Sequence, residues 1–222
     1  MRDPWTGSLR TRLRALPVFI GASPVLEPAA APEGPTELFL GWLDDAIAAG
    51  LPAPHAMTLS TADHTGRVSA RTLILRDVDG AGWHFATAAT SPKGRDLAGN
   101  PNAALTFFWP GLGRQVRLTG SVSDLGTECG AQDFRERGEG SRAATLVGHQ
   151  SEPLSSREVY WAAFATSLAL VRADADLVPR SWSRYALAPD TVEFWQASTD
   201  KGQTRLLYRA EDDHWEKGLL WP

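Results

Sequence analysis

Apolar residues recur three and four positions apart between residues 36 and 50, the spacing of a single buried stripe on a helix. The recurring residues are Phe39, Leu40, Leu43 and Ile47. Thr36 is expected to cap the start of this helix, and Gly50 lies just past its end. The pattern therefore predicts one helix with a face directed at the core.

From residue 56 onward, apolar and polar residues alternate, which is the period of strands with one face buried. Turn signals rich in Gly, Pro, Asp and Asn separate the alternating runs and predict antiparallel hairpins. The predicted strands are 56–62, 67–75, 83–87, 103–109, 114–123, 181–187, 191–196, 205–209 and 215–220.

Further helices are predicted between these strands. Ser91 before Pro92 is a capping serine followed by a proline at the first helical position, and this short helix should end near residue 100. Residues 127–137 are predicted to be helical. Ser155 and Glu158 form a capping box for a last helix that runs to about residue 172. Many short antiparallel strands with a few helices favour a β-barrel of the α+β class.

The chain divides into a short arm and one domain. Residues 1–34 are rich in Pro, Ala and Arg, have no sustained period and are expected to form a mobile arm. Residues 35–222 contain no internal repeat or clear boundary, so they are expected to form a single domain.

Composition narrows the function classes. The 222 residues are 43% apolar and 22% charged, as in an ordinary globular protein, and the net charge of −4 argues against a nucleic-acid partner. No apolar run approaches the ~20 residues of a membrane span. The single cysteine, Cys129, excludes an intrachain disulfide and favours a cytoplasmic location. The five histidines lack metal-ligand spacing, so no metal site is expected.

The start of the helix at Ser91 is the first candidate site. Free N–H groups at a helix start attract phosphate, and Ser91 and Lys93 add a hydroxyl and an ammonium. Arg71 lies on a strand that returns toward this segment. On pattern alone, a plain helix cap with a solvated lysine is the favoured alternative.

Two further candidates lie on late strands. Alternation places Gln115 and Arg117 on one strand face, so the Gln115 amide would meet a heterocycle if that face looks inward, whereas a solvated outer face is an equal alternative. Trp195 is a candidate cover for a planar ligand, and Arg205 a candidate partner for a phosphate or ring carbonyl. Core packing and a surface ion pair are the favoured alternatives for these two.

In their order and spacing, several segments from about residue 36 to 222 resemble the pyridoxamine 5′-phosphate oxidase family. The segments are 56–61 (AMTLST), 71–76 (RTLILR), 85–87 (FAT), 91–94 (SPKG), 100–101 (NP), 113–116 (GRQV), 150–151 (QS), 193–196 (EFWQ) and 219–222 (LLWP).

This resemblance implies an FMN-binding split β-barrel of six or more mainly antiparallel strands with flanking helices, assembled as a homodimer. It implies that Trp195 and Arg205 reach FMN from the partner subunit. The implied FMN-binding positions are Arg71, Leu73, Arg76, Thr87, Ser91, Lys93, Gln115, Gln150, Ser151, Trp195 and Arg205.

The resemblance also implies a substrate site with some departures from the family pattern. Its implied substrate-binding positions are Arg76, Asp133, Arg137, Ser141, Lys201 and Gln203, and the last two are the candidate catalytic pair. Asp133 stands where the family has a tyrosine. Lys201 lacks the planar fork of the family's arginine, and Gln203 cannot titrate like the family's histidine.

The implied reaction is oxidation of pyridoxamine or pyridoxine 5′-phosphate to pyridoxal 5′-phosphate, with O2 as acceptor and H2O2 as product. The departures leave two alternatives open. One is an FMN-dependent oxidase of another small ring, as in phenazine-type secondary metabolism. The other is a non-catalytic protein that binds flavin or pyridoxal phosphate.

Overall fold

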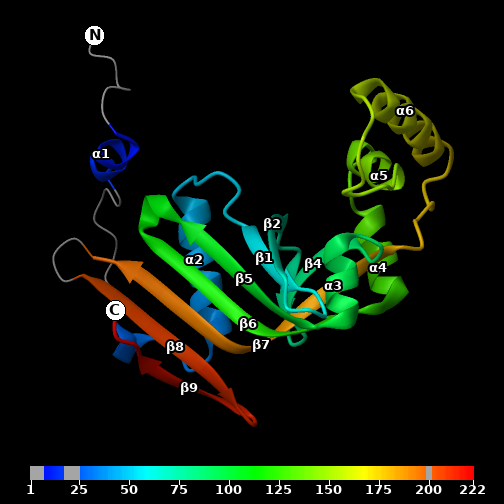
Figure 1. Ribbon diagram of the computed structural model, residues 1–222. Coiled ribbons are helices and arrows are strands. Elements are labelled where there is room, and N and C mark those ends of the chain that lie inside the picture. The colour runs from blue at the N-terminus through cyan, green and yellow to red at the C-terminus, as the bar shows by residue number, and fades with distance from the viewer. Residues whose placement is uncertain (1–7, 18–25, 199–201) are drawn as a thin grey trace.

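The computed structural model describes residues 8–17, 26–198 and 202–222 (Figure 1). In these residues a curled antiparallel sheet of nine strands has the order β2-β1-β5-β6-β7-β4-β3, with β8 added to β7 and β9 added to β8. The strands are β1 (Ala56–Ala62), β2 (Val68–Ile74), β3 (Asp77–Asp79), β4 (Gly82–Ala88), β5 (Asn102–Trp109), β6 (Arg114–Asp124), β7 (Trp182–Ala197), β8 (Gln203–Glu211) and β9 (His214–Leu219).

Six α-helices accompany the sheet in the described ranges. They are α1 (Leu9–Arg14), α2 (Pro35–Ala48), α3 (Pro92–Gly99), α4 (Gly126–Arg135), α5 (Glu139–Leu146) and α6 (Arg157–Ala173). Figure 1 shows α4, α5 and α6 gathered on one side of the molecule, near α3 and β4, while β8 and β9 extend on the other side. The predicted barrel of mainly antiparallel strands with flanking helices is confirmed. No helix of the described residues is long and apolar enough to cross a membrane.

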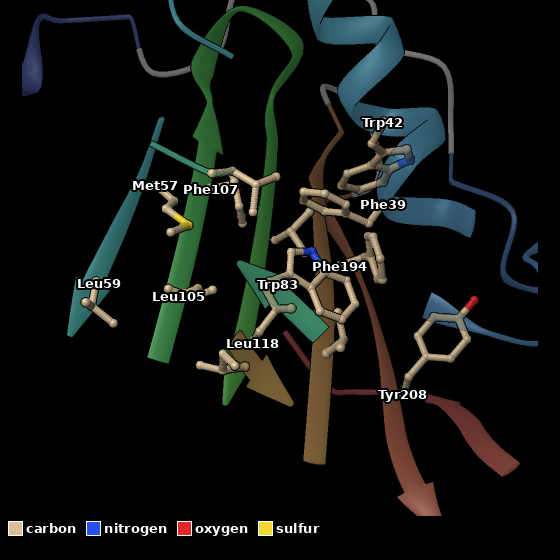
Figure 2. Packing of buried hydrophobic residues seen from close by; sticks show 14 of the residues in the cluster. Phe39, Trp42, Met57, Leu59, Trp83, Leu105, Phe107, Leu118, Phe194 and Tyr208 are labelled. Atoms are coloured by element: carbon tan, nitrogen blue, oxygen red, sulfur yellow. The ribbon is translucent and has the colours of Figure 1, made fainter. Parts of the chain in front are cut away.

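The core lies between α2 and the concave face of the sheet (Figure 2). Phe39 of α2 packs edge-on against Phe107, with ring centroids 4.8 Å apart, and Trp42 meets Phe194 at 5.2 Å. On the strands, the buried side chains alternate with exposed or half-buried ones, as in β6, because one face of the pleat looks at the core. Alternation in the sequence therefore predicted β1, β2, β4, β5, β6, β8 and β9 as single strands, whereas the short β3 was not predicted.

A long bent strand replaces two predicted ones. The segments expected at 181–187 and 191–196 are both part of β7, and its pairing with β6 shifts register between Thr119 and Gly120. A β-carbon on Gly120 would lie 2.1 Å from the Ala188 carbonyl oxygen, so only glycine allows this close approach. Pro189 within the strand resembles a strand end in the sequence, but here it lies at the bulge.

Two predicted helix caps are wrong by one or two positions. Gly34 precedes α2 and Pro35 is its first residue, so Thr36 lies inside the helix. Ser156 caps α6, since its hydroxyl accepts the Val159 N–H, and the predicted cap Ser155 lies one residue outside the cap. Adjacent serines offer the same hydroxyl, so the sequence could not choose between them.

Part of the predicted N-terminal arm contacts the sheet. Leu26 and Ala31 are buried. Tyr208 of β8 donates a hydrogen bond to the Pro32 carbonyl at 2.8 Å, and Lys217 of β9 donates to the Ala31 carbonyl at 2.7 Å. Residues 26–34 therefore lie against β8 and β9. The division of the chain into arm and domain remains a prediction.

Candidate functional site

The start of α3 is built as a hydroxyl-lined socket for the Lys93 side chain. Ser91 caps the helix, and its Oγ accepts the Gly94 N–H at 3.2 Å. Lys93 is only 5% exposed, and its Nζ donates to Thr87 Oγ1 at 3.2 Å and to Ser91 Oγ at 3.3 Å. A β-carbon on Gly94 would lie 2.4 Å from the Ala89 carbonyl oxygen, so a glycine is needed for this helix end to pack so closely.

The charge of Lys93 has no carboxylate to balance it at contact distance. Among the described residues, no carboxylate oxygen lies within 4.0 Å of Lys93 Nζ. Burial, and then the positive charge of Arg71, lower the pKa of Lys93 to about 8, although Asp96 opposes them. A buried cation that contacts only hydroxyls favours an incoming anion.

Arg71 supplies a second cation at the same end of the barrel. Its Nη1 donates to the Leu59 carbonyl at 3.2 Å and to Thr61 Oγ1 at 2.9 Å, while Nη2 lies 4.0 Å from Asp96 Oδ2. Burial lowers the pKa of Arg71, with Asp96 acting in the opposite sense. We call Arg71, Thr87, Ser91 and Lys93 the cradle. Two cations, two hydroxyls and a helix start fit the phosphate of FMN.

A cleft of about 790 Å³ begins beside the cradle and contains three of the six predicted substrate residues. Its wall includes four predicted cofactor positions, Leu73, Arg76, Thr87 and Gln150, together with Arg137 and Ser141. The other lining residues are Thr72, Ile74, Ala86, Ala88, Thr90, Glu136, Gly138, Ala144, Thr145, Gly148, His149, Ser181 and Trp182.

Arg137 is held in one orientation at the substrate end of this cleft. Its Nη2 donates to Ser141 Oγ at 2.6 Å, and its Nη1 donates to Thr145 Oγ1 at 3.0 Å. The guanidinium carbon lies 4.3 Å from the ring centroid of Trp182. Burial lowers the pKa of Arg137, with a smaller opposing effect of Asp133. The group is therefore a pre-positioned seat for an anion.

Asp133 does not line the cleft but lies directly behind it. It is 2% exposed, and its Oδ1 accepts a hydrogen bond from Arg76 Nε at 2.7 Å. Its Oδ2 accepts one from Trp182 Nε1 at 2.9 Å. Asp133 therefore lies behind the cleft wall and contacts two of its residues, Arg76 and Trp182.

A second group of predicted residues forms a row across β6, β7 and β8. Gln115 pairs with Trp195, and Trp195 pairs with Arg205 in register. Trp195 Nε1 donates a hydrogen bond to Gln203 Oε1. Arg114 and Val116 are buried, so the predicted alternation holds, and Gln115 lies on the face away from the core.

Within this row, the Arg205 side chain is held by an ion pair with buried Glu193. Arg205 Nε donates to Glu193 Oε1 at 2.8 Å, and Arg117 donates to the other carboxylate oxygen. Burial would raise the pKa of Glu193, but hydrogen bonds and charges from Arg205 and Arg117 outweigh it and lower that pKa.

The row and the cleft are separate within one chain. Gln115, Trp195, Gln203 and Arg205 are not part of the cleft wall. Ser151 lies beside the cleft residue Gln150 and has a positive φ of 72°. Lys201 lies outside the described residues.

Among the cleft residues that were not singled out from the sequence, two contact predicted site residues. Trp182 lines the cleft and holds both Asp133 and Arg137. Thr145, like Ser141, accepts a hydrogen bond from the Arg137 guanidinium. Ser141 and Thr145 are four residues apart on α5 and so share one face, a signal that requires α5 to be recognised first.

The structure also brings together Asp77, Asp79 and His84, whose ligand-type atoms lie within 4.8 Å of one another. His84 Nε2 lies 2.8 Å from Asp79 Oδ1, and Arg184 donates to Asp77 Oδ2 at 2.8 Å. Arg184 of β7 therefore already supplies positive charge to Asp77, and this ion pair together with the contact between His84 and Asp79 accounts for the group.

Comparison with known proteins identifies the family of the chain. Residues 43–170 match the family described as Pyridoxamine 5′-phosphate oxidase. The chain belongs to the pyridoxamine 5′-phosphate oxidase family. Residues 182–222 match the Pyridoxine 5′-phosphate oxidase C-terminal dimerisation region, so the chain carries the dimerisation segment of that family. The family is one of FMN-dependent oxidoreductases, and the enzyme class and cofactor expected from the sequence are confirmed at the level of the family.

Several individual relatives are similar over most of the chain. A pyridoxine/pyridoxamine 5′-phosphate oxidase of Thermosynechococcus vestitus is 41% identical over 201 residues, covering 89% of this chain and 93% of the relative. A protein of the same name from Pseudomonas paraeruginosa is 38% identical over 199 residues, with the same coverage of 89% and 93%.

Two solved structures have a similar fold. PhzG from Burkholderia lata, solved with tetrahydrophenazine-1-carboxylic acid, is 32% identical with a TM-score of 0.85, covering 91% of this chain and all (100%) of that one. A pyridoxamine 5′-phosphate oxidase-related, FMN binding protein from Nostoc punctiforme is 20% identical with a TM-score of 0.68, covering 88% and 100% of the two chains. The second likeness concerns the fold alone.

Proposed function

We propose that this enzyme oxidises pyridoxine or pyridoxamine 5′-phosphate to pyridoxal 5′-phosphate. One observation carries the proposal: the cradle borders the cleft at Thr87, and Arg137 lines the same cleft, so separate cationic positions are available for a cofactor phosphate and a substrate phosphate. The relatives named pyridoxine/pyridoxamine 5′-phosphate oxidase support the same substrate.

The residues of this chain would bind and orient, while bound FMN supplies the two-electron chemistry. Arg71 and Lys93 hold the FMN phosphate. Arg137 and Ser141 bind the anionic group of the substrate, and Arg76 adds its charge beside them. Lys201 and Gln203 orient the substrate ring.

The overall reaction balances with molecular oxygen. The substrate carbon loses a hydride and its amine or hydroxyl group loses a proton, so that O2 is reduced to H2O2. Pyridoxine 5′-phosphate gives the aldehyde directly. Pyridoxamine 5′-phosphate gives an imine, which water hydrolyses to the aldehyde and ammonia.

The functional unit in this proposal is a homodimer. The row of Gln115, Trp195 and Arg205 does not line the cleft of its own chain. We assign Trp195 and Arg205 to the FMN site of the partner subunit, and the match to a dimerisation region supports that assignment. A cytoplasmic location belongs to the same proposal and rests on the single cysteine.

A second candidate substrate is another anionic ring, as in phenazine-type metabolism. Asp133 in place of a tyrosine favours it, because a carboxylate behind Arg76 reduces the positive charge available to a phosphate. The likeness to PhzG, whose structure contains a phenazine carboxylic acid, points the same way.

Turnover by the FMN-loaded protein tests the proposed function. Pyridoxamine 5′-phosphate should yield the absorbance of the aldehyde product at a rate well above that of free FMN. Arg137→Ala should raise KM because it removes a charge-assisted hydrogen bond to the substrate phosphate. Product formation no faster than with free FMN would overturn the proposal.

A further inference from the structure

The substrate end of the cleft contains an unusual set of three charges. Arg76 and Arg137 bring two positive charges to the cleft wall, and Asp133 places one negative charge directly behind Arg76. The sum at this end is one net positive charge. The acidic lining residue Glu136 is exposed, so solvent screens its charge more strongly.

Because Asp133 is buried, its negative charge acts strongly on a ligand in the cleft. Asp133 is 2% exposed, and both carboxylate oxygens accept hydrogen bonds, from Arg76 Nε and Trp182 Nε1. A charge fixed in the protein and removed from water acts on a neighbouring ligand with little screening.

The charge of the ligand then decides whether the net positive charge of Arg76, Arg137 and Asp133 is neutralised. We call these three residues together the seat. A single negative charge on the ligand would neutralise the net positive charge, whereas a phosphate monoester with two charges would leave one in excess. Uncompensated charge in a partly desolvated site is costly.

We infer that Asp133 is a specificity-determining residue that suits this seat to planar ring acids carrying one negative charge, such as a ring carboxylate. The inference rests on the proposed function, since it concerns the same seat, and extends it to a second substrate class. Asp133 acts through Arg76 and Trp182 and does not itself line the cleft.

The test compares two small ring ligands that differ in charge. Benzoate carries one negative charge, and phenyl phosphate carries nearly two at pH 8. The protein is saturated with FMN first, so that the cradle is filled, and dissociation constants are measured by titration calorimetry. Binding is thereby read independently of turnover.

Asp133→Asn is the decisive variant, since it keeps the side-chain shape and an acceptor for Trp182 but removes the charge. We expect about fivefold tighter binding of benzoate and about twenty-five-fold tighter binding of phenyl phosphate, because the Coulomb energy scales with ligand charge. Asp213→Asn is the matched control, because it removes the same charge from a side chain that is 99% exposed and should change neither constant.

A double variant tests charge balance rather than shape. Arg76→Gln with Asp133→Asn restores one net positive charge, supplied by Arg137, so the ratio of the two constants should return to within about twofold of the original. A ratio that stays at the Asp133→Asn value would refute the inference. So would equal effects of Asp133→Asn on both ligands, which indicate that the carboxylate only orients Arg76.

The inference and the proposed function can fail separately. A shifted ratio without turnover of pyridoxamine 5′-phosphate would refute the proposed substrate and support the role of Asp133. Turnover with an unchanged ratio would support the substrate and refute that role. Failure of both ligands to bind would refute the inference, while turnover of pyridoxamine 5′-phosphate still decides the proposed function.

Discussion

Among single residues, Lys93 best connects burial with cofactor binding. Lys93 is 5% exposed, and its ammonium lies among the hydroxyls of Thr87 and Ser91. A cation removed from water destabilises the folded chain until an anion joins it. The lysine therefore reduces the stability of the FMN-free protein and favours binding of the phosphate.

Replacing Lys93 by methionine should separate these two effects. We expect Lys93→Met to raise the melting temperature of the FMN-free protein, since an apolar chain of similar length replaces a buried charge. FMN should bind about 10- to 150-fold more weakly, which corresponds to one lost charged hydrogen bond. Lys217→Met, on β9, is the control and should leave FMN affinity unchanged. Unaltered affinity in Lys93→Met would place the phosphate elsewhere.

The pKa of Lys93 also predicts a pH dependence of stability. Burial lowers this pKa from 10.5 to about 8, so above pH 8 the unfolded chain binds the proton more tightly than the folded one. The free energy of unfolding of the FMN-free protein should therefore rise with pH between about 8 and 10.5. Urea unfolding at pH 8 and pH 10 measures this rise, which should be absent from Lys93→Met. Parallel pH profiles for the two proteins would contradict the prediction.

Among the elements, β7 shows where sequence patterns succeed and where they fail. The sequence predicted strand structure on both sides of residues 188–190, but Pro189 and Asp190 imitate a turn, and one strand was therefore predicted as two. The bulge that accommodates them depends on Gly120 in the neighbouring strand, about 70 positions away in the chain. Such long-range compensation has no local signature in a sequence.

Gly120→Ala tests this dependence. A methyl group would lie 2.1 Å from the Ala188 carbonyl oxygen, so β6 and β7 would have to separate locally. We expect a loss of about 2–4 kcal/mol of unfolding free energy, measured by urea denaturation. Gly140→Ala in α5, where nothing lies within 4 Å, should be neutral or stabilising. Similar stability of both variants would contradict the role given to the bulge.

In the whole molecule, two sets of predicted cofactor residues remain apart. The cradle lies beside the cleft, and the row of Gln115, Trp195 and Arg205 lies on the face of β6, β7 and β8 away from the core. Local pattern predicted the helix cap at Ser91 but not that Lys93 is buried, because burial depends on how α3 meets β4. The contact of Asp133 with Trp182 joins residues 49 positions apart and was equally invisible in the sequence.

Mixing two defective proteins tests the dimer. A Lys93→Met chain retains Trp195, and a Trp195→Ala chain retains the cradle, so each mixed dimer should contain one intact FMN site. After subunit exchange at equal concentrations, about a quarter of all sites should bind FMN with normal affinity. Stoichiometry by fluorescence titration measures this fraction. No recovery would mean that both residues serve the site of their own chain.

Strand β7 begins at Trp182, on the cleft wall, and carries Trp195 thirteen positions further along. At roughly 3.3 Å per residue, these tryptophans are separated by about 40 Å of continuous backbone. In the proposed dimer, the length of this strand would therefore fix the spacing between two catalytic centres, with one tryptophan at each. A one-residue insertion between them would misplace an indole in one centre and leave the other centre of the same strand undisturbed.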